Sequence, residues 1–146
     1  MGRVSDILRG KGSKIFSITS GSSVFDAVQQ MVNHNVGSLL VLDEGDVKGI
    51  ITERDYLREI VVKGRTSKAT LVREIMTAEV VAVDSTRSIE ECMAVMTERR
   101  IRHLPVVDGG ALVGMVSIGD LVKQMANDRE VEIRYLTEYI TGKYPA

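Results

Sequence analysis

The sequence contains an internal repeat, and this repeat constrains the fold more than any other feature. When the chain is shifted along itself by 65 residues, positions 18–58 lie over 83–123 without a gap. The two copies share these identical pairs: Ser20/Ser85, Ser23/Ser88, Met31/Met96, Leu39/Leu104, Val41/Val106, Asp43/Asp108, Gly45/Gly110, Gly49/Gly114 and Asp55/Asp120. Because the hydrophobic pattern also keeps this register, the sequence predicts two copies of one supersecondary unit.

Each copy closes on the same short motif: a glycine, two apolar residues, a hydroxyl residue, two spacers and an aspartate. The motif occupies residues 49–55 (GIITERD) and 114–120 (GMVSIGD). We expect a buried strand to end at the hydroxyl residue and to turn directly into a helix. Such a corner gathers backbone N–H groups and a hydroxyl, which suit a phosphate, and a carboxylate, which accepts hydrogen bonds from ribose hydroxyls. One such motif occurs by chance, but two at matching positions indicate a binding function.

Around these motifs, each copy reads as strand, helix, strand, strand and helix. Ser23 and Ser88 are expected to cap the first helices, and Ser88 with Glu91 forms a capping-box pattern. Apolar residues then recur at helical spacing: Val24, Ala27, Val28 and Met31, and again Ile89, Cys92, Met93 and Met96. These helices should end near Asn35 and Arg100, and the closing helices should begin near Glu53 and Ile118. Strands are expected over 36–42, 47–51, 103–107 and 112–116, with hairpin turns at 43–46 and 108–111.

These elements predict an α+β fold with two β-α-β-β-α units and an additional C-terminal helix. A unit of about 60 residues is marginal as a separate core, so we expect the copies to pack together by a pseudo-twofold axis. The expected domains are 1–64, then 65–127 after a flexible basic linker at roughly 62–70, and a helical tail over 128–146. One face of the tail would carry Val131, Tyr135, Leu136, Tyr139 and Ile140, with a stop at Gly142.

A short leader precedes each copy. Residues 4–8 (VSDIL) match 72–76 (VREIM), but at an offset of 68, so the first copy carries three extra residues within 9–17. This segment includes 10–14 (GKGSK), which is expected to be a flexible basic loop. The insertion either lengthens the loop or brings Lys11 or Lys14 over a bound phosphate.

Composition excludes several classes of function. The formal net charge is −1 and aromatic residues make up 4% of the chain, which disfavours nucleic-acid binding. No apolar run approaches the length of a membrane span, and residues 1–8 lack the apolar core of a signal peptide. The one cysteine, Cys92, lies on the apolar helix stripe and cannot form an internal disulfide. A cytoplasmic location is therefore expected.

The pattern as a whole resembles a tandem pair of cystathionine-beta-synthase (CBS) domains, often called a Bateman module. The resemblance covers about residues 4–127 and rests on the leaders, the capped helices, the Asp-Gly hairpins and the closing motifs. Residues 49–58 (GIITERDYLR) and 99–106 (RRIRHLPV) look especially like stand-alone two-domain CBS proteins of bacteria and plant mitochondria. This implies two CBS-type units that bind AMP, ADP, ATP, NAD or related ligands as a sensor, without catalysis, in a module that forms a homodimer and signals to an unidentified regulated protein.

The resemblance also implies composite sites in clefts between the two units. In one site, Asp120 would take the ribose hydroxyls and Ser117 a phosphate oxygen, while Ile15, Phe16, Val36, Gly37 and Ser38 hold the adenine. The other site would use Asp55 and Thr52, together with Val80, Val81, Ile101, Arg102 and His103. Lys14 and Arg54 complete the candidate residues. Because the first copy has Gly37 and Ser38 where the second has Arg102 and His103, the two sites should not be equivalent.

Simpler interpretations remain open for each signal. The aspartates and hydroxyls can act only as helix caps, and Arg54, Arg58 and Arg65 can be solvated surface residues. A metal site, a phosphate loop at 10–13 and a Cys92–His103 nucleophile pair each lack the required partners. The main alternative function is a structural dimerisation or partner-docking module with empty clefts. An enzyme acting on nucleotides and a nucleic-acid binder are weaker alternatives.

Overall fold

The computed structural model describes residues 2–12 and 14–128, and within it the chain divides into two compact units. Ile15–Val81 forms one of them, called here the repeat-1 unit. Residues 2–12 and 14 join residues 82–128 in the other, called here the repeat-2 unit. The tail expected over 128–146, with its face of Val131, Tyr135, Leu136, Tyr139 and Ile140 and its stop at Gly142, lies outside the described residues apart from Asp128.

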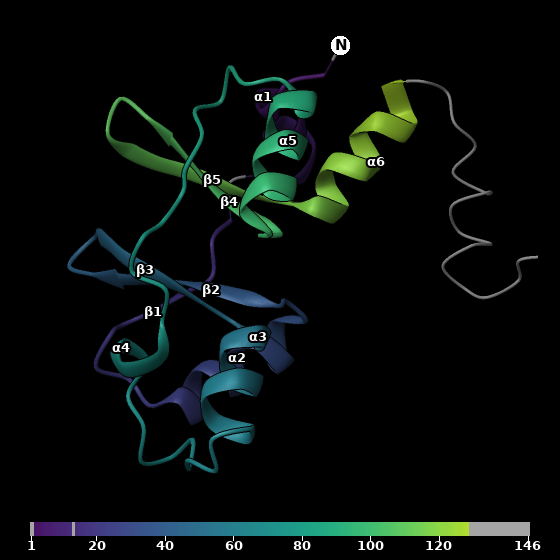
Figure 1. The fold of residues 1–146 in the computed structure, drawn as a ribbon. Helices are drawn as coiled ribbons and strands as arrows, with labels where there is room; N and C mark the ends of the chain where they lie inside the picture. The colour runs from purple at the N-terminus through teal and green to yellow at the C-terminus, as the bar shows by residue number, and fades with distance from the viewer. Residues whose placement is uncertain (1, 13, 129–146) are drawn as a thin grey trace, which may run out of the picture. The chain divides into compact units, whose positions relative to one another are not determined.

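The repeat-1 unit is a three-stranded sheet with helices on one face (Figure 1). Its elements are β1 (Ser17–Ile18), α2 (Val24–His34), β2 (Ser38–Asp43), β3 (Asp46–Thr52), α3 (Glu53–Tyr56), a π-helical turn η1 (Leu57–Val61) and α4 (Val72–Ile75). Strand β2 is central, parallel to β1 and antiparallel to β3. The core between sheet and helices consists of Ile18, Val24, Ala27, Met31, Leu39, Val41, Ile51, Ile60, Val72 and Ile75.

The repeat-2 unit has the same plan. Its elements are α1 (Val4–Lys11), α5 (Ile89–Arg99), β4 (His103–Asp108), β5 (Ala111–Ser117) and α6 (Ile118–Asp128). Strands β4 and β5 are antiparallel, and a parallel bridge from Val83 to Val106 takes the place of β1. The α+β class and the expected order of elements in the two copies are confirmed.

The two copies agree in fine detail. Ser23 and Ser88 cap α2 and α5 as expected, and the left-handed residues Asn35 and Arg100, each with φ of 55°, end these helices. The register of each hairpin shifts at the same place, between Val41 and Leu42 and between Val106 and Val107. The repeated serine and aspartate also form repeated bonds: Asp43 accepts from the Ser20 N–H at 3.0 Å, and Asp108 accepts from the Ser85 N–H at 2.9 Å.

Each leader helix packs on the other copy. The N–H groups of Val4 and Ser5 donate to the carbonyl oxygens of Arg87 and Ser85, and the N–H of Ile89 donates to the carbonyl of Gly2. The equivalent bonds bring α4 onto the first copy: Val72 to Ser22, Arg73 to Ser20, and Val24 to Thr70. Each compact unit therefore contains one copy and the leader of the other copy. The domain ranges 1–64 and 65–127 stay a prediction.

Asp6 and Glu74, the acidic residues at matching positions of the two leaders, form the same hydrogen bond at the start of their helices. The N–H of Arg3 donates to Asp6 at 2.8 Å, and the N–H of Leu71 donates to Glu74 at 2.7 Å. Each carboxylate thus satisfies an N–H at the start of its helix, where no intrahelical acceptor exists.

The extra residues of the first leader lengthen its helix. Helix α1 has eight residues and α4 has four. The expected loop at 10–14 is therefore wrong for Gly10 and Lys11, which are helical. Gly12, with φ of 85°, ends α1 and donates its N–H to the Leu8 carbonyl at 2.8 Å. The added turn places a lysine at the end of α1.

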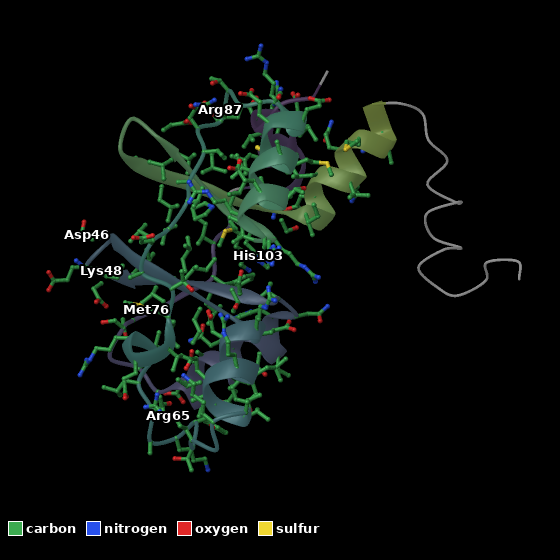
Figure 2. The ribbon with its side chains drawn as sticks, viewed as in Figure 1. Asp46, Lys48, Arg65, Met76, Arg87 and His103 are labelled. Atoms are coloured by element: carbon green, nitrogen blue, oxygen red, sulfur yellow. The ribbon has the colours of Figure 1, made fainter. Side chains whose placement is uncertain are left out.

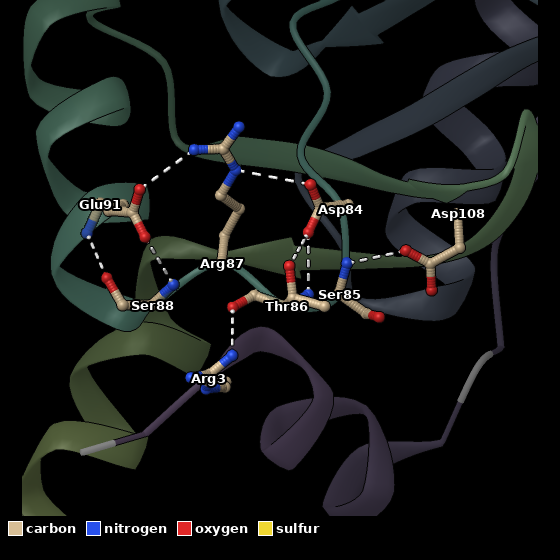
Figure 3. A network of polar contacts seen from close by, with 8 residues as sticks. All are labelled: Arg3, Asp84, Ser85, Thr86, Arg87, Ser88, Glu91 and Asp108. Atoms are coloured by element: carbon tan, nitrogen blue, oxygen red, sulfur yellow. Dashed lines mark hydrogen bonds and ion pairs between the residues drawn. The ribbon is translucent and has the colours of Figure 1, made fainter.

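A polar network holds the segment before α5 in the repeat-2 unit (Figure 3). Arg87 bridges Asp84 at 3.5 Å and Glu91 at 3.0 Å, while Asp84 accepts from the N–H and the hydroxyl of Thr86. Arg3 donates to the Thr86 carbonyl at 3.2 Å. These contacts fix the loop that leads into α5 and tie it to the start of α1.

Within residues 2–12 and 14–128, no helix combines the length and the apolar character that a membrane span requires.

Candidate functional site

The two closing motifs form matching corners, and each contains a reciprocal capping box. In the repeat-1 unit, the Thr52 N–H donates to Asp55 Oδ2 at 3.0 Å and the Asp55 N–H donates to Thr52 Oγ1 at 3.2 Å. In the repeat-2 unit, the Ser117 N–H donates to Asp120 Oδ2 at 2.9 Å and the Asp120 N–H donates to Ser117 Oγ at 3.2 Å. The hydroxyls and carboxylates therefore cap α3 and α6, as the simpler interpretation requires. Capping engages Oδ2 of each aspartate and is compatible with a ligand at Oδ1.

The corners differ in burial. The side chain of Asp55 is 6% exposed, whereas that of Asp120 is 23% exposed. Burial disfavours the ionised carboxylate of Asp55 and raises its pKa, against the opposing effects of the Thr52 N–H and the charge of Arg58. The nearest Arg58 nitrogen is 3.7 Å from Asp55 Oδ1 and belongs to a largely exposed side chain.

Asp120 has a closer cation. The Lys11 ammonium lies 2.8 Å from Asp120 Oδ2 and also donates to the Met115 carbonyl at 3.1 Å. Burial again opposes ionisation, but the Lys11 ammonium and the Ser117 N–H together outweigh it, and the pKa of Asp120 is lowered. The two corners are therefore electrostatically different.

In the repeat-1 unit, the β2–β3 hairpin places three candidate residues beside the Thr52 corner. Ser38 is the register partner of Thr52, and the Glu53 N–H donates to the Gly37 carbonyl at 3.0 Å. Val36 and Gly37 line a cavity of about 430 Å³, whose other walls are Val28, Met31, Val32, Asn35, Glu53, Tyr56 and Leu57. The Glu53 carboxylate lies over Gly37, where an added Cβ would be 2.9 Å from Glu53 Oε1.

In the repeat-2 unit, the same geometry places 101–103 beside the Ser117 corner. His103 is the register partner of Ser117, and the Ile118 N–H donates to the Arg102 carbonyl at 2.9 Å. The Arg102 side chain is exposed, and those of Ile101 and His103 are half-buried. Figure 2 shows His103 at the start of β4.

The remaining candidates lie in the linking segments and in α3. The Phe16 ring stacks on His34 with centroids 4.0 Å apart, and the Phe16 carbonyl accepts from the Leu40 N–H. Ile15, Val80 and Val81 are half-buried, whereas Lys14 and Arg54 are exposed. Each unit by itself thus gathers 36–38 with Thr52 and Asp55, or 101–103 with Ser117 and Asp120. The expected composite grouping joins residues of different units and stays a prediction.

Of the nine residues that line the repeat-1 cavity, sequence reasoning assigned Val36 and Gly37 to the site and missed the other seven. Among these, Glu53 lies two residues before the motif aspartate and Tyr56 directly after it, so their position on α3 was the available signal. Sequence reasoning also did not decide between two lysines. Lys11, which reaches Asp120, was considered together with Lys14, but no sequence pattern specifies a contact between residues so far apart.

No cluster of potential metal ligands occurs in residues 2–12 and 14–128. Cys92 is buried in the core, and burial raises the pKa of its thiol. A raised pKa is the opposite of what a nucleophilic cysteine requires, so Cys92 is a packing residue.

Comparison with known proteins identifies this arrangement. The family model for the CBS domain matches residues 4–62 and 72–127, which include both leaders and both corners. The chain belongs to the CBS-domain family. The tandem pair expected from the resemblance is therefore confirmed.

Relatives and solved structures extend over nearly the whole chain. The mitochondrial CBS domain-containing protein CBSX3 of Arabidopsis thaliana is 42% identical over 97% of this chain and 73% of its own. The structure of a CBS-domain protein from Burkholderia ambifaria MC40-6 is 50% identical, with a TM-score of 0.86 over 90% of this chain and 99% of its own.

A third structure contains ligands. The CBS domain pair of protein MJ0100, in complex with 5'-methylthioadenosine and S-adenosyl-L-methionine, aligns with a TM-score of 0.76 and 25% identity over 88% of this chain and 98% of its own. Members of the family that share this fold thus include a protein that binds adenosine-containing molecules.

Proposed function

We propose that the chain is a non-enzymatic regulatory sensor that binds an adenosine-containing ligand at its Thr52/Asp55 and Ser117/Asp120 corners. AMP, ADP, ATP and NAD are the candidate ligands, and the ligand would be regulatory rather than a catalytic cofactor. The observation that carries the proposal is the duplicated corner. In both units a backbone N–H, a hydroxyl and a carboxylate converge at the start of a helix. The adenosine ligands of MJ0100 favour this class of ligand.

Each corner offers complementary groups to a nucleotide. A ribose has two neighbouring hydroxyls, and a carboxylate accepts both. A phosphate is favoured at the N-terminal end of α3 or α6, where N–H groups and the helix dipole point toward it. Residues 36–38 and 101–103 adjoin these corners, so we place the base near them, together with Ile15, Phe16, Val80 and Val81.

Isothermal titration with AMP, ADP, ATP and NAD tests the proposal. We expect Asp55→Asn and Asp120→Asn each to weaken binding by roughly 10- to 100-fold at the affected corner, because a charge-assisted hydrogen bond is lost. Asparagine keeps an oxygen for the capping bond, so the helix start is preserved. Glu91→Gln is the matched control, since Glu91 caps α5 in the same manner away from both corners. Equal binding by all four proteins would refute the site.

A ligand must act through different affinities for two states of the protein. We propose that occupancy changes the packing of a homodimer, and that an unidentified protein responds to the change. No nucleic acid or membrane is expected as a partner, and a cytoplasmic location stays a prediction.

One observation favours the alternative of a structural docking module without a ligand. Large apolar side chains are exposed on α2, on η1 and directly after η1 in the repeat-1 unit: Phe25, Val32, Leu57, Val61 and Val62. Val32 is 73% exposed and Val62 is 80% exposed. Such a surface indicates a protein contact, which fits both a sensor dimer and a ligand-free one.

Thermal unfolding separates these two functions. A ligand at about 100 times its Kd stabilises the folded protein by about 2.7 kcal/mol, which raises Tm. The absence of a Tm rise with all four nucleotides, combined with a dimer that Val32→Lys disrupts, would favour the docking module.

A further inference from the structure

The Lys11–Asp120 ion pair is a feature of one corner alone. Lys11 ends α1, and its ammonium reaches Asp120 Oδ2 at 2.8 Å from a segment far away in the sequence. The cation next to Asp55 is Arg58, which comes from the following turn and lies 3.7 Å away. The leader α4 packs on the repeat-1 unit but ends after four residues, so it lacks the turn that carries Lys11 in α1.

Packing determines where Lys11 lies. Val4 and Ile7 of α1 are buried, and an added Cβ on Gly114 would be 2.6 Å from Leu8 Cδ2, so α1 lies directly against β5. Gly12 ends the helix immediately after Lys11. The lysine therefore extends from a fixed helix end toward the corner, and its Nζ makes a second bond to the Met115 carbonyl on β5.

The ammonium and the corner N–H converge on the same atom. Asp120 Oδ2 accepts from Lys11 Nζ at 2.8 Å and from the Ser117 N–H at 2.9 Å. An anion bound at the start of α6 would therefore lie within reach of Lys11. The lysine side chain is 39% exposed, which leaves it room to move from the carboxylate to such an anion.

We propose that Lys11 makes the repeat-2 corner selective for ligands that carry a phosphate. This inference rests on the proposed function. A ribose whose two hydroxyls bind both carboxylate oxygens of Asp120 competes with Lys11 for Oδ2. A phosphate on the same ligand then gives the Lys11 ammonium a new anionic partner. A neutral nucleoside gives it none. The corner consequently favours AMP, ADP or ATP over adenosine.

The test is isothermal titration of adenosine and AMP into the full chain carrying Asp55→Asn, which weakens the repeat-1 corner. We expect Lys11→Met to lower the affinity ratio of AMP to adenosine by roughly 10-fold or more, because one charge-assisted hydrogen bond to phosphate is lost. Affinity for adenosine should be unchanged or higher, since Asp120 is no longer paired. Lys11→Arg should keep the ratio close to that of the parent.

Lys63→Met is the matched control, because Lys63 forms a surface ion pair with Glu59 in the repeat-1 unit. If Lys11→Met weakens AMP and adenosine equally, or changes neither, Lys11 only attaches α1 to the unit and the inference is wrong. If the chain with both aspartates intact binds neither adenosine nor any of the four nucleotides, the proposed function itself fails and the inference fails with it. Circular dichroism and the unfolding midpoint establish that each variant is folded.

Discussion

A Cβ added to Gly49 would lie 2.6 Å from the carbonyl oxygen of Thr77. Gly49 directly precedes Ile50, which pairs with Thr77 and so joins the segment after α4 to β3. The Met76 side chain, labelled in Figure 2, is also close to this position, with Sδ 2.9 Å from the added Cβ. The glycine of the motif is thus required by the exchanged leader rather than by a ligand.

Gly49→Ala and Gly114→Ala should therefore destabilise the folded protein to different extents. At Gly49 the new methyl group meets backbone, which cannot move without disturbing the Ile50–Thr77 bonds. At Gly114 it meets the end of the flexible Leu8 side chain. We expect Gly49→Ala to lower the free energy of unfolding by about 1–3 kcal/mol, as overpacking does elsewhere. Gly114→Ala should lower it by less. Urea unfolding measures both, and equal losses would contradict this account.

Because α1 packs on the repeat-2 unit, its removal should destabilise that unit rather than the repeat that follows α1 in the sequence. Deleting residues 2–11 removes acceptors and donors that bond to Ser85, Arg87 and Ile89. Hydrogen exchange should then become faster, by about 10-fold or more in the least stable amides, in α5 and β5 of the repeat-2 unit. Amides of β2 and β3, in the repeat that follows α1 directly, serve as the internal control. Faster exchange confined to β2 and β3 would show that α1 packs on its own repeat.

The fold was largely predictable from the sequence because its signals are local. Serine caps, helical stripes and Asp-Gly hairpins set the bounds of α2, α5 and the four long strands to within one or two residues. The leader exchange was not predictable, because both leaders carry the same pattern and fit either copy. The length of α1 depended on whether Gly10 was helical, and the local sequence did not specify this.

The candidate site was predictable in part, for a related reason. The motif positions of Thr52, Asp55, Ser117 and Asp120 led directly to the corners. The structure places Ser38 beside Thr52, and His103 beside Ser117, within one copy, whereas the expected grouping assigned each of them to the corner of the other copy. The contact of Lys11 with Asp120 depends on where α1 packs, and no local pattern encodes that.

At neutral pH, the ionised Asp120 should stabilise the folded protein, whereas the ionised Asp55 should destabilise it. The pKa of Asp120 is lowered in the folded protein, from a reference of 3.8, so its contribution is present above about that pH and is lost as pH falls through the folded pKa. The pKa of Asp55 is raised, so folding is progressively disfavoured as pH rises from 3.8 through the folded pKa. Asp120→Asn should therefore destabilise the protein at pH 7, and Asp55→Asn should stabilise it.

Urea unfolding at pH 7 and at pH 3 measures this difference. Each effect should shrink at pH 3, because both aspartates become largely protonated in the unfolded chain, where their reference pKa is 3.8. Glu91→Gln gives the effect of neutralising a carboxylate at an ordinary helix start. A stabilising Asp120→Asn at pH 7 would show that the Lys11 pair does not compensate for burial.

The hydroxyl of Ser117 should have two separable roles, capping and ligand binding. Ser117→Ala removes the bond to the Asp120 N–H, and Ser88→Ala removes the equivalent bond to the Glu91 N–H at 3.1 Å. Loss of a serine cap costs about 1 kcal/mol, so both variants should unfold at similarly lower urea concentrations. In titrations with AMP, Ser117→Ala alone should bind about 10-fold more weakly, because a hydrogen bond to the phosphate is also lost. Equal affinities in the two variants would mean that Ser117 serves α6 only as a cap.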